Sequence, residues 1–182
     1  MLMQKSGATY RGFDFSDIAI RQASSRTGRP ELFSRADARD ARSYAFEYDT
    51  IVCTEVLEHI NADLKVVRNW KAGAWCVCSV PNFDWDSHVR FFRSCEEVKG
   101  RYGELIDIEA IIEIPRSVMP GGDIRRYLRN LRWSRNDPSQ LLGFLGIQTF
   151  ERLGGWFLFW GIKRHPPNAP SRRQSTTSDT RV

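Results

Sequence analysis

Long apolar runs and CxxC cysteine pairs are both missing from this chain of 182 residues. No stretch approaches the roughly 18–20 apolar residues of a membrane span. The first six residues contain no apolar segment long enough for a secretion signal. None of the four cysteines has the CxxC spacing of a zinc or redox motif. Three of them fall in predicted strands, so we expect reduced, packed thiols in a cytoplasmic protein that does not contact membranes.

Histidine and N-terminal glycine are also scarce. The three histidines are scattered and lack acidic partners at ligand spacing, so we expect no metal site. Only Gly7 precedes Tyr10, which leaves no glycine-rich loop at the start of the chain. The absence of a G-x-G-x-x-G fingerprint counts against an ordinary dinucleotide-binding domain.

Positive charge is concentrated in the last third of the chain. Between Pro115 and Asn136, six arginines stand against one aspartate, Asp123, and the whole chain carries a net charge of +5. A basic helix of this kind can be solvated, can cover an acidic substrate, or can contact nucleic acid. Because no nucleic-acid motif accompanies it, nucleic acid is the least favoured of these partners. Residues 166–182 are rich in Pro, Ser, Thr and Arg, and we expect a disordered tail there.

Apolar periodicity and turn residues predict a single α/β domain over residues 1–165. The expected strands span residues 8–15, 31–35, 50–54, 74–80 and 105–114. One helix is expected to begin at Ser16 or Asp17 and to stop near Gly28. Three more are expected over residues 57–70, 94–102 (with a Ser94–Glu97 capping box) and 122–133. A hairpin is expected over 148–163, with its second strand at 156–162. This order predicts a three-layer sandwich with an antiparallel edge, and residues 117–147 form an insertion that could be a substrate lid.

Three segments carry a resemblance to a known family. They are Tyr10–Ser16, Tyr48–Ile60 with its Glu-Val-Leu-Glu-His sequence, and Gly73–Asn82 with its Ser-Val-Pro-Asn ending. In this order they resemble the class I, Rossmann-like S-adenosylmethionine-dependent methyltransferases. The resemblance implies a mostly parallel sheet with an antiparallel C-terminal hairpin, and S-adenosylmethionine as the cofactor.

The resemblance also implies a set of residues that contact the adenosine part of the cofactor. Asp14 ends the first strand, where an ionised carboxylate can accept from both ribose hydroxyls, and Phe15 would lie against the adenine. Asp37 would accept the adenine amino group, while the backbone N–H of Ala38 meets a ring nitrogen. The simpler alternatives are that Asp14 caps the following helix and that Asp37 is a solvated loop residue.

The end of the strand at 50–54 would face the reactive part of the cofactor. In the resembled family, Thr54 and Glu55 at this turn lie beside the sulfonium and the methyl-transfer channel. His59 and His88 are weak candidates for catalysis. A structural hydrogen bond at the start of the helix explains His59 at least as well. His88 lies in a loop where the resembled family also tends to have a histidine, so it is expected near the substrate.

The first strand of the family, which carries its glycine-rich loop, has no counterpart here. The sheet is therefore expected to have a gap between the strands at 8–15 and 50–54, where unpaired backbone groups cost roughly 1–3 kcal/mol each when buried. Three explanations are a start codon assigned too late, which we favour, an inactive truncation, or closure of the gap by the neighbouring strands.

The function expected from these observations is S-adenosylmethionine-dependent methyl transfer to a small-molecule acceptor, in a chain that is inactive if truly truncated. The alternative from another class is a non-catalytic Rossmann-like remnant whose basic helix binds an anionic partner.

Overall fold

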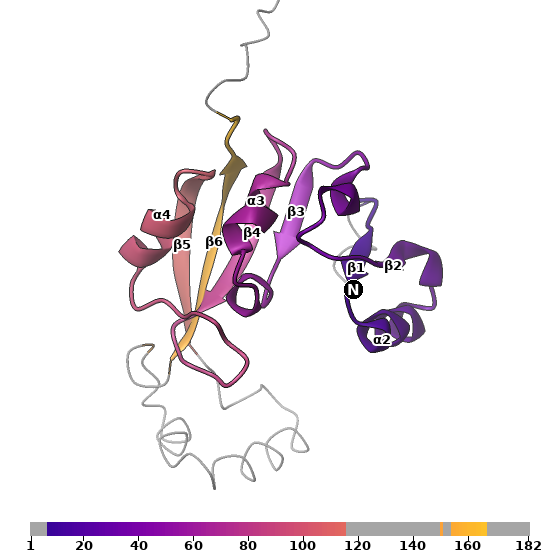
Figure 1. Cartoon of the computed structure of the whole chain (residues 1–182), viewed down its shortest axis with the longest axis horizontal. Helices are drawn as coiled ribbons and strands as arrows, with labels where there is room; N and C mark the ends of the chain where they lie inside the picture. Colours follow the sequence, from indigo (N-terminus) through magenta and orange to yellow (C-terminus); the bar gives the residue numbers. More distant parts are fainter. Residues whose placement is uncertain (1–6, 116–149, 151–153, 167–182) are drawn as a thin grey trace, which may run out of the picture.

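The computed structural model describes residues 7–115, 150 and 154–166 (Figure 1). Its strands are β1 (Gly12–Asp14), β2 (Phe33–Arg35), β3 (Thr50–Cys53), β4 (Trp75–Pro81), β5 (Ile106–Pro115) and β6 (Gly155–Lys163). Its helices are α2 (Asp17–Thr27), α3 (Asp63–Arg68) and α4 (Cys95–Tyr102), with 3-10 turns η1 (Pro30–Leu32), η2 (Ala41–Tyr44) and η3 (Leu57–His59). None of the described helices is long and apolar enough to cross a membrane.

The strands form two separate sheets. β1 and β2 pair in parallel, and the other four strands follow the order β3-β4-β6-β5. β3 and β4 are parallel, whereas β6 runs antiparallel to both β4 and β5. In the described part of the chain no strand lies between β1 and β3, so the predicted gap is present and the neighbouring strands do not close it. The fold is a Rossmann-like α/β arrangement whose sheet is divided at this point.

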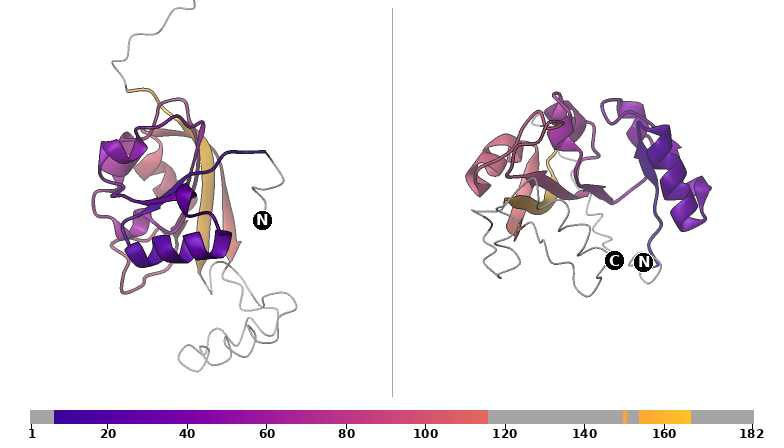
Figure 2. Two further views of the ribbon diagram at one scale, coloured as in Figure 1. Left: turned by 90° about the vertical axis from the view of Figure 1, so that its right-hand side faces the viewer. Right: turned by 90° about the horizontal axis from the view of Figure 1, so that it is seen from below.

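Helices α3 and α4 lie against one face of the four-stranded sheet (Figures 1 and 2). Alternation along β6 matches this arrangement, because Phe157 and Phe159 are fully buried while Trp156 and Trp160 on the other face are half-buried. The β4 strand is buried along most of its length, as expected for a central strand. α2 instead contacts β1 and β2. The described residues thus show helices on one face of the larger sheet, where three layers were expected.

The core lies between the four-stranded sheet and helices α3 and α4. Its largest fully buried apolar side chains come from β4, β5, β6, α4 and the segment around α3: Leu57, Val66, Val67, Val80, Pro81, Val98, Tyr102, Ile106, Phe157 and Phe159. Tyr102 and Phe159 stack at 5.5 Å between ring centroids. Gly161 permits the close approach of β5 and β6, because a Cβ there would collide with the carbonyl of Asp107.

The β1–β2 unit is attached to this core through a few contacts. The ring of Phe13 meets Tyr44 edge-on at 5.4 Å, and the Tyr44 hydroxyl donates to the carbonyl of Ala38 at 3.0 Å. The side-chain amide of Asn69, just after α3, donates to the carbonyl of Arg39 at 3.1 Å. These contacts fix the end of β2 next to the start of the larger sheet.

The predicted helix over 57–70 is wrong in its first half. The chain forms the short turn η3, and α3 begins only at Asp63. The cause is Arg90, whose guanidinium donates to the carbonyls of Leu57, Ile60 and Asn61, and so occupies acceptors that a continuous helix would use. The strands expected at 8–15 and 31–35 also shorten to the three residues of β1 and of β2.

The C-terminal hairpin is also wrong as predicted. β6 pairs with β4 and β5 rather than with a strand directly before it, and Phe150 is helical. Two of the four strand pairings are parallel and two are antiparallel, so the mostly parallel sheet is only partly confirmed. The expected insertion at 117–147, its helix over 122–133 and the tail after Pro166 lie outside the described residues.

Candidate functional site

The residues expected to hold a cofactor follow the ends of β1, β2 and β3. Asp14 is the last residue of β1, and Asp37 comes two residues after β2. Because the two strands are parallel and the Asp14 carbonyl accepts from the N–H of Ala36 at 3.0 Å, both aspartates lie at the same edge of this sheet. Thr54 and Glu55 follow β3 in the other sheet.

Asp14 takes part in starting α2. Its Oδ1 accepts from the backbone N–H of Ser16 at 2.7 Å, and Ser16 itself is the N-cap residue of the helix. The neighbouring Phe15 side chain is 76% exposed. A carboxylate offers about four lone-pair sites, so the bond to Ser16 does not use up the acceptor capacity of Asp14.

Asp37 is already paired with a cation. The guanidinium of Arg39 donates to both carboxylate oxygens, with a shortest distance of 2.7 Å from Nη2 to Oδ2. These bonds hold the pKa of Asp37 at about 2. Asp37 and Arg39 line a cavity of about 500 Å³ together with Asp40, Ala41, Lys65 and Asn69. Ala38 packs against the core instead of entering this cavity's lining.

Glu55 links the ends of two parallel strands. Its backbone N–H donates to Oγ of Ser79 on β4, and the Ser79 hydroxyl donates back to Glu55 Oε1, both at 3.1 Å. Glu55 has a φ of 57°, which is uncommon for a residue with a long side chain and marks a sharp turn after β3. Thr54 beside it is exposed.

Glu58 is a buried carboxyl group without a hydrogen-bond partner on either oxygen among the described residues. Burial raises its pKa to about 7, and the charge of Glu55 adds to the effect. The backbone N–H groups of Glu58 and Val56 lower the pKa somewhat without reaching hydrogen-bonding geometry. An unpaired buried carboxyl group lowers the stability of the fold, and such groups cluster at ligand-binding and catalytic sites.

His59 and His88 lie beside this carboxyl group. Their rings meet edge-on at 5.0 Å between centroids, although 29 positions separate them in the sequence. Nε2 of His59 is 3.9 Å from Oε1 of Glu58. The loop after β4 brings His88 here, because the N–H of Val89 donates to the carbonyl of Glu58 at 2.8 Å.

Arg90 and Asp63 hold that loop in place. Arg90 binds the carbonyls around η3 and lies 3.3 Å from Asp63, which is fully buried. Asp63 also accepts two hydrogen bonds from Arg101, at 2.6 and 2.7 Å, and one from the hydroxyl of Tyr102 at 2.9 Å. One carboxylate therefore joins α3, α4 and the loop that carries His88.

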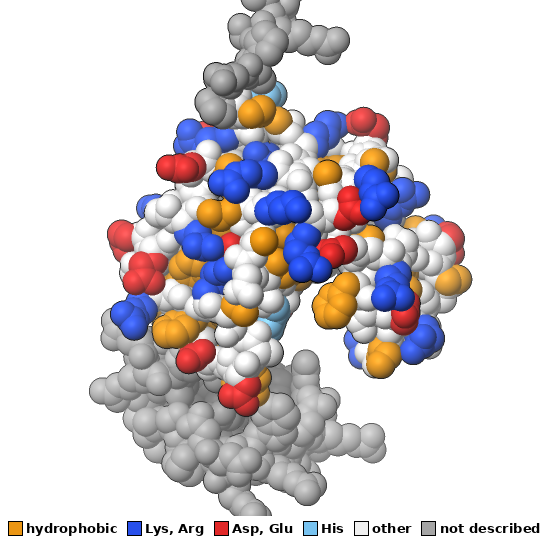
Figure 3. Space-filling view, viewed as in Figure 1, with side chains coloured by type: hydrophobic (Ala, Val, Ile, Leu, Met, Phe, Trp, Pro, Cys, Tyr) orange, Lys and Arg blue, Asp and Glu red, His pale blue; other side chains and the backbone are white. Residues whose placement is uncertain are grey.

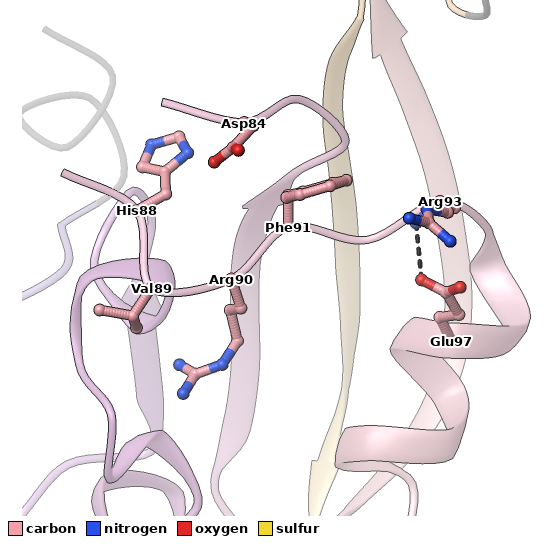
Figure 4. Close-up of a pocket in the computed structure, with 7 residues that line it drawn as sticks. All are labelled: Asp84, His88, Val89, Arg90, Phe91, Arg93 and Glu97. Carbon is pink, nitrogen blue, oxygen red and sulfur yellow. Dashed lines mark hydrogen bonds between the residues drawn. The ribbon is translucent and has the colours of Figure 1, made fainter. Parts of the chain in front are cut away.

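A cavity of about 410 Å³ opens beside His88 (Figure 4). It is lined by residues of the loop after β4 and the first turn of α4: Asp84, His88, Val89, Arg90, Phe91, Arg93 and Glu97. The Arg93 N–H donates to the Glu97 carboxylate at 2.7 Å across one side of it. A space of this size can hold a small molecule.

The structure thus brings Asp14 and Asp37 to one sheet edge and His59 and His88 together beside Glu58. Thr54 and Glu55 instead follow β3, which belongs to a different sheet from β1, and Figure 3 shows a hollow in the surface between the two parts of the molecule. Sequence reasoning missed the contributions of Ser79 and Arg90. A serine inside a buried apolar strand is a recognisable signal for Ser79, whereas the sequence around Arg90 carries none.

The fold and these strand-end residues define a Rossmann-like domain, and comparison with known proteins gives the family. A family model described as a methyltransferase domain matches residues 1–153. The chain belongs to this methyltransferase family. A search of curated proteins gave no match.

Solved structures share the fold at low sequence identity. A candidate sarcosine dimethylglycine methyltransferase from Galdieria sulphuraria has 12% identity and a TM-score of 0.58, over 90% of this chain and 72% of that one. A chain from the complex of the Haloferax volcanii Trm112 methyltransferase activator with a candidate methyltransferase has 15% identity and a TM-score of 0.57, over 92% and 78%. The [4+2]-cyclase SpnF has 11% identity and a TM-score of 0.57, over 91% and 71%. These likenesses concern the fold.

Proposed function

We propose that this chain is an S-adenosylmethionine-dependent methyltransferase that acts on a small-molecule acceptor in the cytoplasm. The observation that supports this most directly is the position of Asp14 and Asp37 at the carboxyl ends of two adjacent parallel strands, in a chain of the methyltransferase family. Ligands of open α/β sheets bind at this edge.

The residues present fit the adenosine half of the cofactor. Asp14 keeps acceptor sites for two vicinal hydroxyls after its bond to Ser16. Asp37 is ionised at neutral pH, because its pKa is about 2, and is thus an acceptor for an amino group once Arg39 yields one oxygen. Phe15 is exposed next to Asp14 and offers an aromatic face to a base.

The reactive half of the site would be formed by the turn after β3. S-adenosylmethionine supplies a methyl group on a positively charged sulfur. Glu55 is fixed by its two bonds with Ser79, so its carboxylate has a defined place at the end of β3 where it can attract such a cation. The cavity beside His88 is the candidate place for the acceptor.

Calorimetric titration of the full chain with S-adenosylmethionine and with S-adenosylhomocysteine tests this proposal. We expect micromolar binding, weakened about tenfold or more in Asp14→Asn, because the amide keeps an oxygen for the Ser16 N–H but loses a charged acceptor for ribose. Asp17→Asn is the matched control, since Asp17 is an exposed carboxylate three positions away that pairs with Arg35.

Two results would contradict the proposal. Equal affinity of wild type and Asp14→Asn would remove Asp14 from the site. No heat at millimolar cofactor would instead support the second candidate, a non-catalytic Rossmann-like domain, which the division of the sheet between β1 and β3 favours. Its proposed contact with an anionic partner would involve the arginine-rich segment between residues 116 and 136, outside the described residues.

A further inference from the structure

We propose that Glu58, His59 and His88 form a binding site for a divalent transition-metal cation. The three side chains come from η3 and from the loop after β4, and each offers one ligand atom. The proposal concerns this chain's own metal binding and stands apart from the cofactor contacts at Asp14 and Asp37.

The ligand atoms already converge. A carboxylate oxygen of Glu58 and one ring nitrogen from each histidine all lie within 4.8 Å of one another, and the pair formed by Glu58 and His59 is at 3.9 Å. Ligand atoms that bind a tetrahedral ion at about 2.1 Å lie about 3.4 Å from one another. The most distant pair of the group therefore needs to approach by up to about 1.4 Å to hold an ion, which is within the reach of side-chain rotation.

Each imidazole ring has one nitrogen next to a backbone carbonyl. Nδ1 of His59 lies 2.9 Å from the carbonyl of Ser87, and Nδ1 of His88 lies 3.3 Å from the carbonyl of Phe83. A carbonyl oxygen can only accept, so in the neutral ring Nδ1 donates and Nε2 keeps its lone pair. Metal-binding histidines commonly have one ring nitrogen fixed by a backbone carbonyl and the other directed at the ion.

Glu58 supplies the second, independent observation. Its side chain has no exposed surface, and neither oxygen has a hydrogen-bond partner in the described part of the chain. Among the described residues, no donor reaches hydrogen-bonding geometry with this buried carboxyl group. A cation between Glu58 and the histidines would satisfy that group, whereas an ordinary buried carboxyl is satisfied by neighbouring donors, as Asp63 is by Arg101 and Tyr102.

The donor set and the surroundings indicate the kind of ion. Two imidazole nitrogens and one carboxylate oxygen suit first-row ions such as Zn²⁺, Fe²⁺ or Co²⁺, while Ca²⁺ and Mg²⁺ prefer oxygen ligands throughout. Three protein ligands leave coordination positions open. His59 is exposed, and His88 lines the 410 Å³ cavity, so an ion held here can be reached by a small molecule (Figure 4).

The expectation of no metal site was based on the wide spacing of the histidines in the sequence. In the folded chain two of them lie close together. His88 is brought next to Glu58 and His59 by two sets of contacts. The N–H of Val89 donates to the carbonyl of Glu58, and the guanidinium of Arg90 donates to carbonyls of the η3 segment. Glu58 is next to His59 in the sequence. It comes close to His88 only because this loop folds back onto η3.

The test is titration of the full-length, tag-free chain with Co²⁺, followed by its visible absorption, and with Zn²⁺ by calorimetry. We expect one ion per chain with a micromolar Kd. Glu58→Gln and His88→Asn should each weaken binding by about tenfold or more. His165→Asn is the matched control, because His165 is the third histidine of the chain, is exposed and lies outside the group. Circular dichroism of each variant checks that it is folded.

Several outcomes would overturn the proposal. Equal binding by wild type and His88→Asn would do so, as would equal loss in His165→Asn. Loss of the ion in Cys95→Ser would assign binding to that partly exposed thiol instead. If Glu58→Gln fails to fold, His59→Asn and His88→Asn decide the matter, since both rings reach the surface more than Glu58 does. The S-adenosylmethionine titration is separate, so either proposal can fail while the other holds.

Discussion

The β1–β2 unit and the four-stranded sheet share one chain but differ in how deeply their side chains are packed. No residue of α2 is buried, and no residue of β1 or β2 is fully buried. In contrast β4 is buried along most of its length and β6 on every second residue. The two halves of the candidate site therefore lie on parts of the fold that differ in how much of their side-chain surface is buried. Asp14 and Asp37, which we propose to contact adenosine, lie on the weakly packed unit, and Glu58 lies next to the firmly packed sheet.

Carboxylates show the same difference at single-residue scale. Asp37 accepts three hydrogen bonds from the guanidinium of Arg39, and Asp63 accepts two from the guanidinium of Arg101. Asp37 makes its pair in solvent, where the net stabilisation of an ion pair is small. Asp63 is fully buried and binds groups from two other elements, so its loss would leave cations without a counter-charge inside the fold.

The largest expected effect on stability is therefore that of Asp63→Asn. We expect it to lower the free energy of unfolding by about 3 kcal/mol, at the low end of the range for a broken buried pair because the Arg101 side chain is still 34% exposed. Urea unfolding followed by circular dichroism measures this. Asp107→Asn is the control, since Asp107 pairs with Arg164 at the surface of the same sheet and should change little. Equal losses in both variants would contradict the comparison.

The contribution of Asp63 should also depend on pH. Burial by itself would raise the pKa of Asp63, but hydrogen bonds from Arg101 and Tyr102 outweigh it and hold the pKa below its usual value. A carboxyl whose folded pKa is depressed stabilises the fold above its unfolded pKa of about 3.9, and this is lost as the pH falls through the folded pKa. The difference in stability between wild type and Asp63→Asn should thus be constant above about pH 5 and shrink below about pH 4.

Thermal unfolding of the two proteins side by side, from neutral to acidic buffer, tests the pH dependence. A difference that stays the same at low pH would mean that the loss in Asp63→Asn comes from packing around the amide and not from the missing charge.

The sequence predicted those features that depend on neighbouring residues. The cap of α4 is present as expected, with Ser94 Oγ accepting from the N–H of Glu97 at 3.3 Å. β4 was predicted within a residue at each end, since its apolar run and closing proline are local signals. The gap between β1 and β3 also followed from the sequence, because it depends on which strand is missing and not on side-chain detail.

Features set by distant residues could not be predicted in this way. The break between η3 and α3 is caused by Arg90, 30 positions or so further along, whose donors take helix carbonyls. The meeting of His59 and His88 depends on the same loop. The pairing of β6 with β5 joins segments on either side of residues 116–154, so no local turn signal announces it. In each case a long-range contact overrides a reasonable local pattern.

The smallest expected effect on stability is that of Asp37→Asn. This variant tests the exposed ion pair of the β1–β2 unit, as Asp63→Asn tests the buried one. The amide keeps an oxygen that can accept from Arg39, and the carboxylate it replaces is solvent-exposed, so urea unfolding should give the same midpoint as wild type. A clear loss of stability would mean that the β1–β2 unit depends on this pair. If the midpoint is unchanged and S-adenosylmethionine binding falls in the same variant, the fall reports a lost contact with the cofactor, because the fold that carries Asp37 is intact.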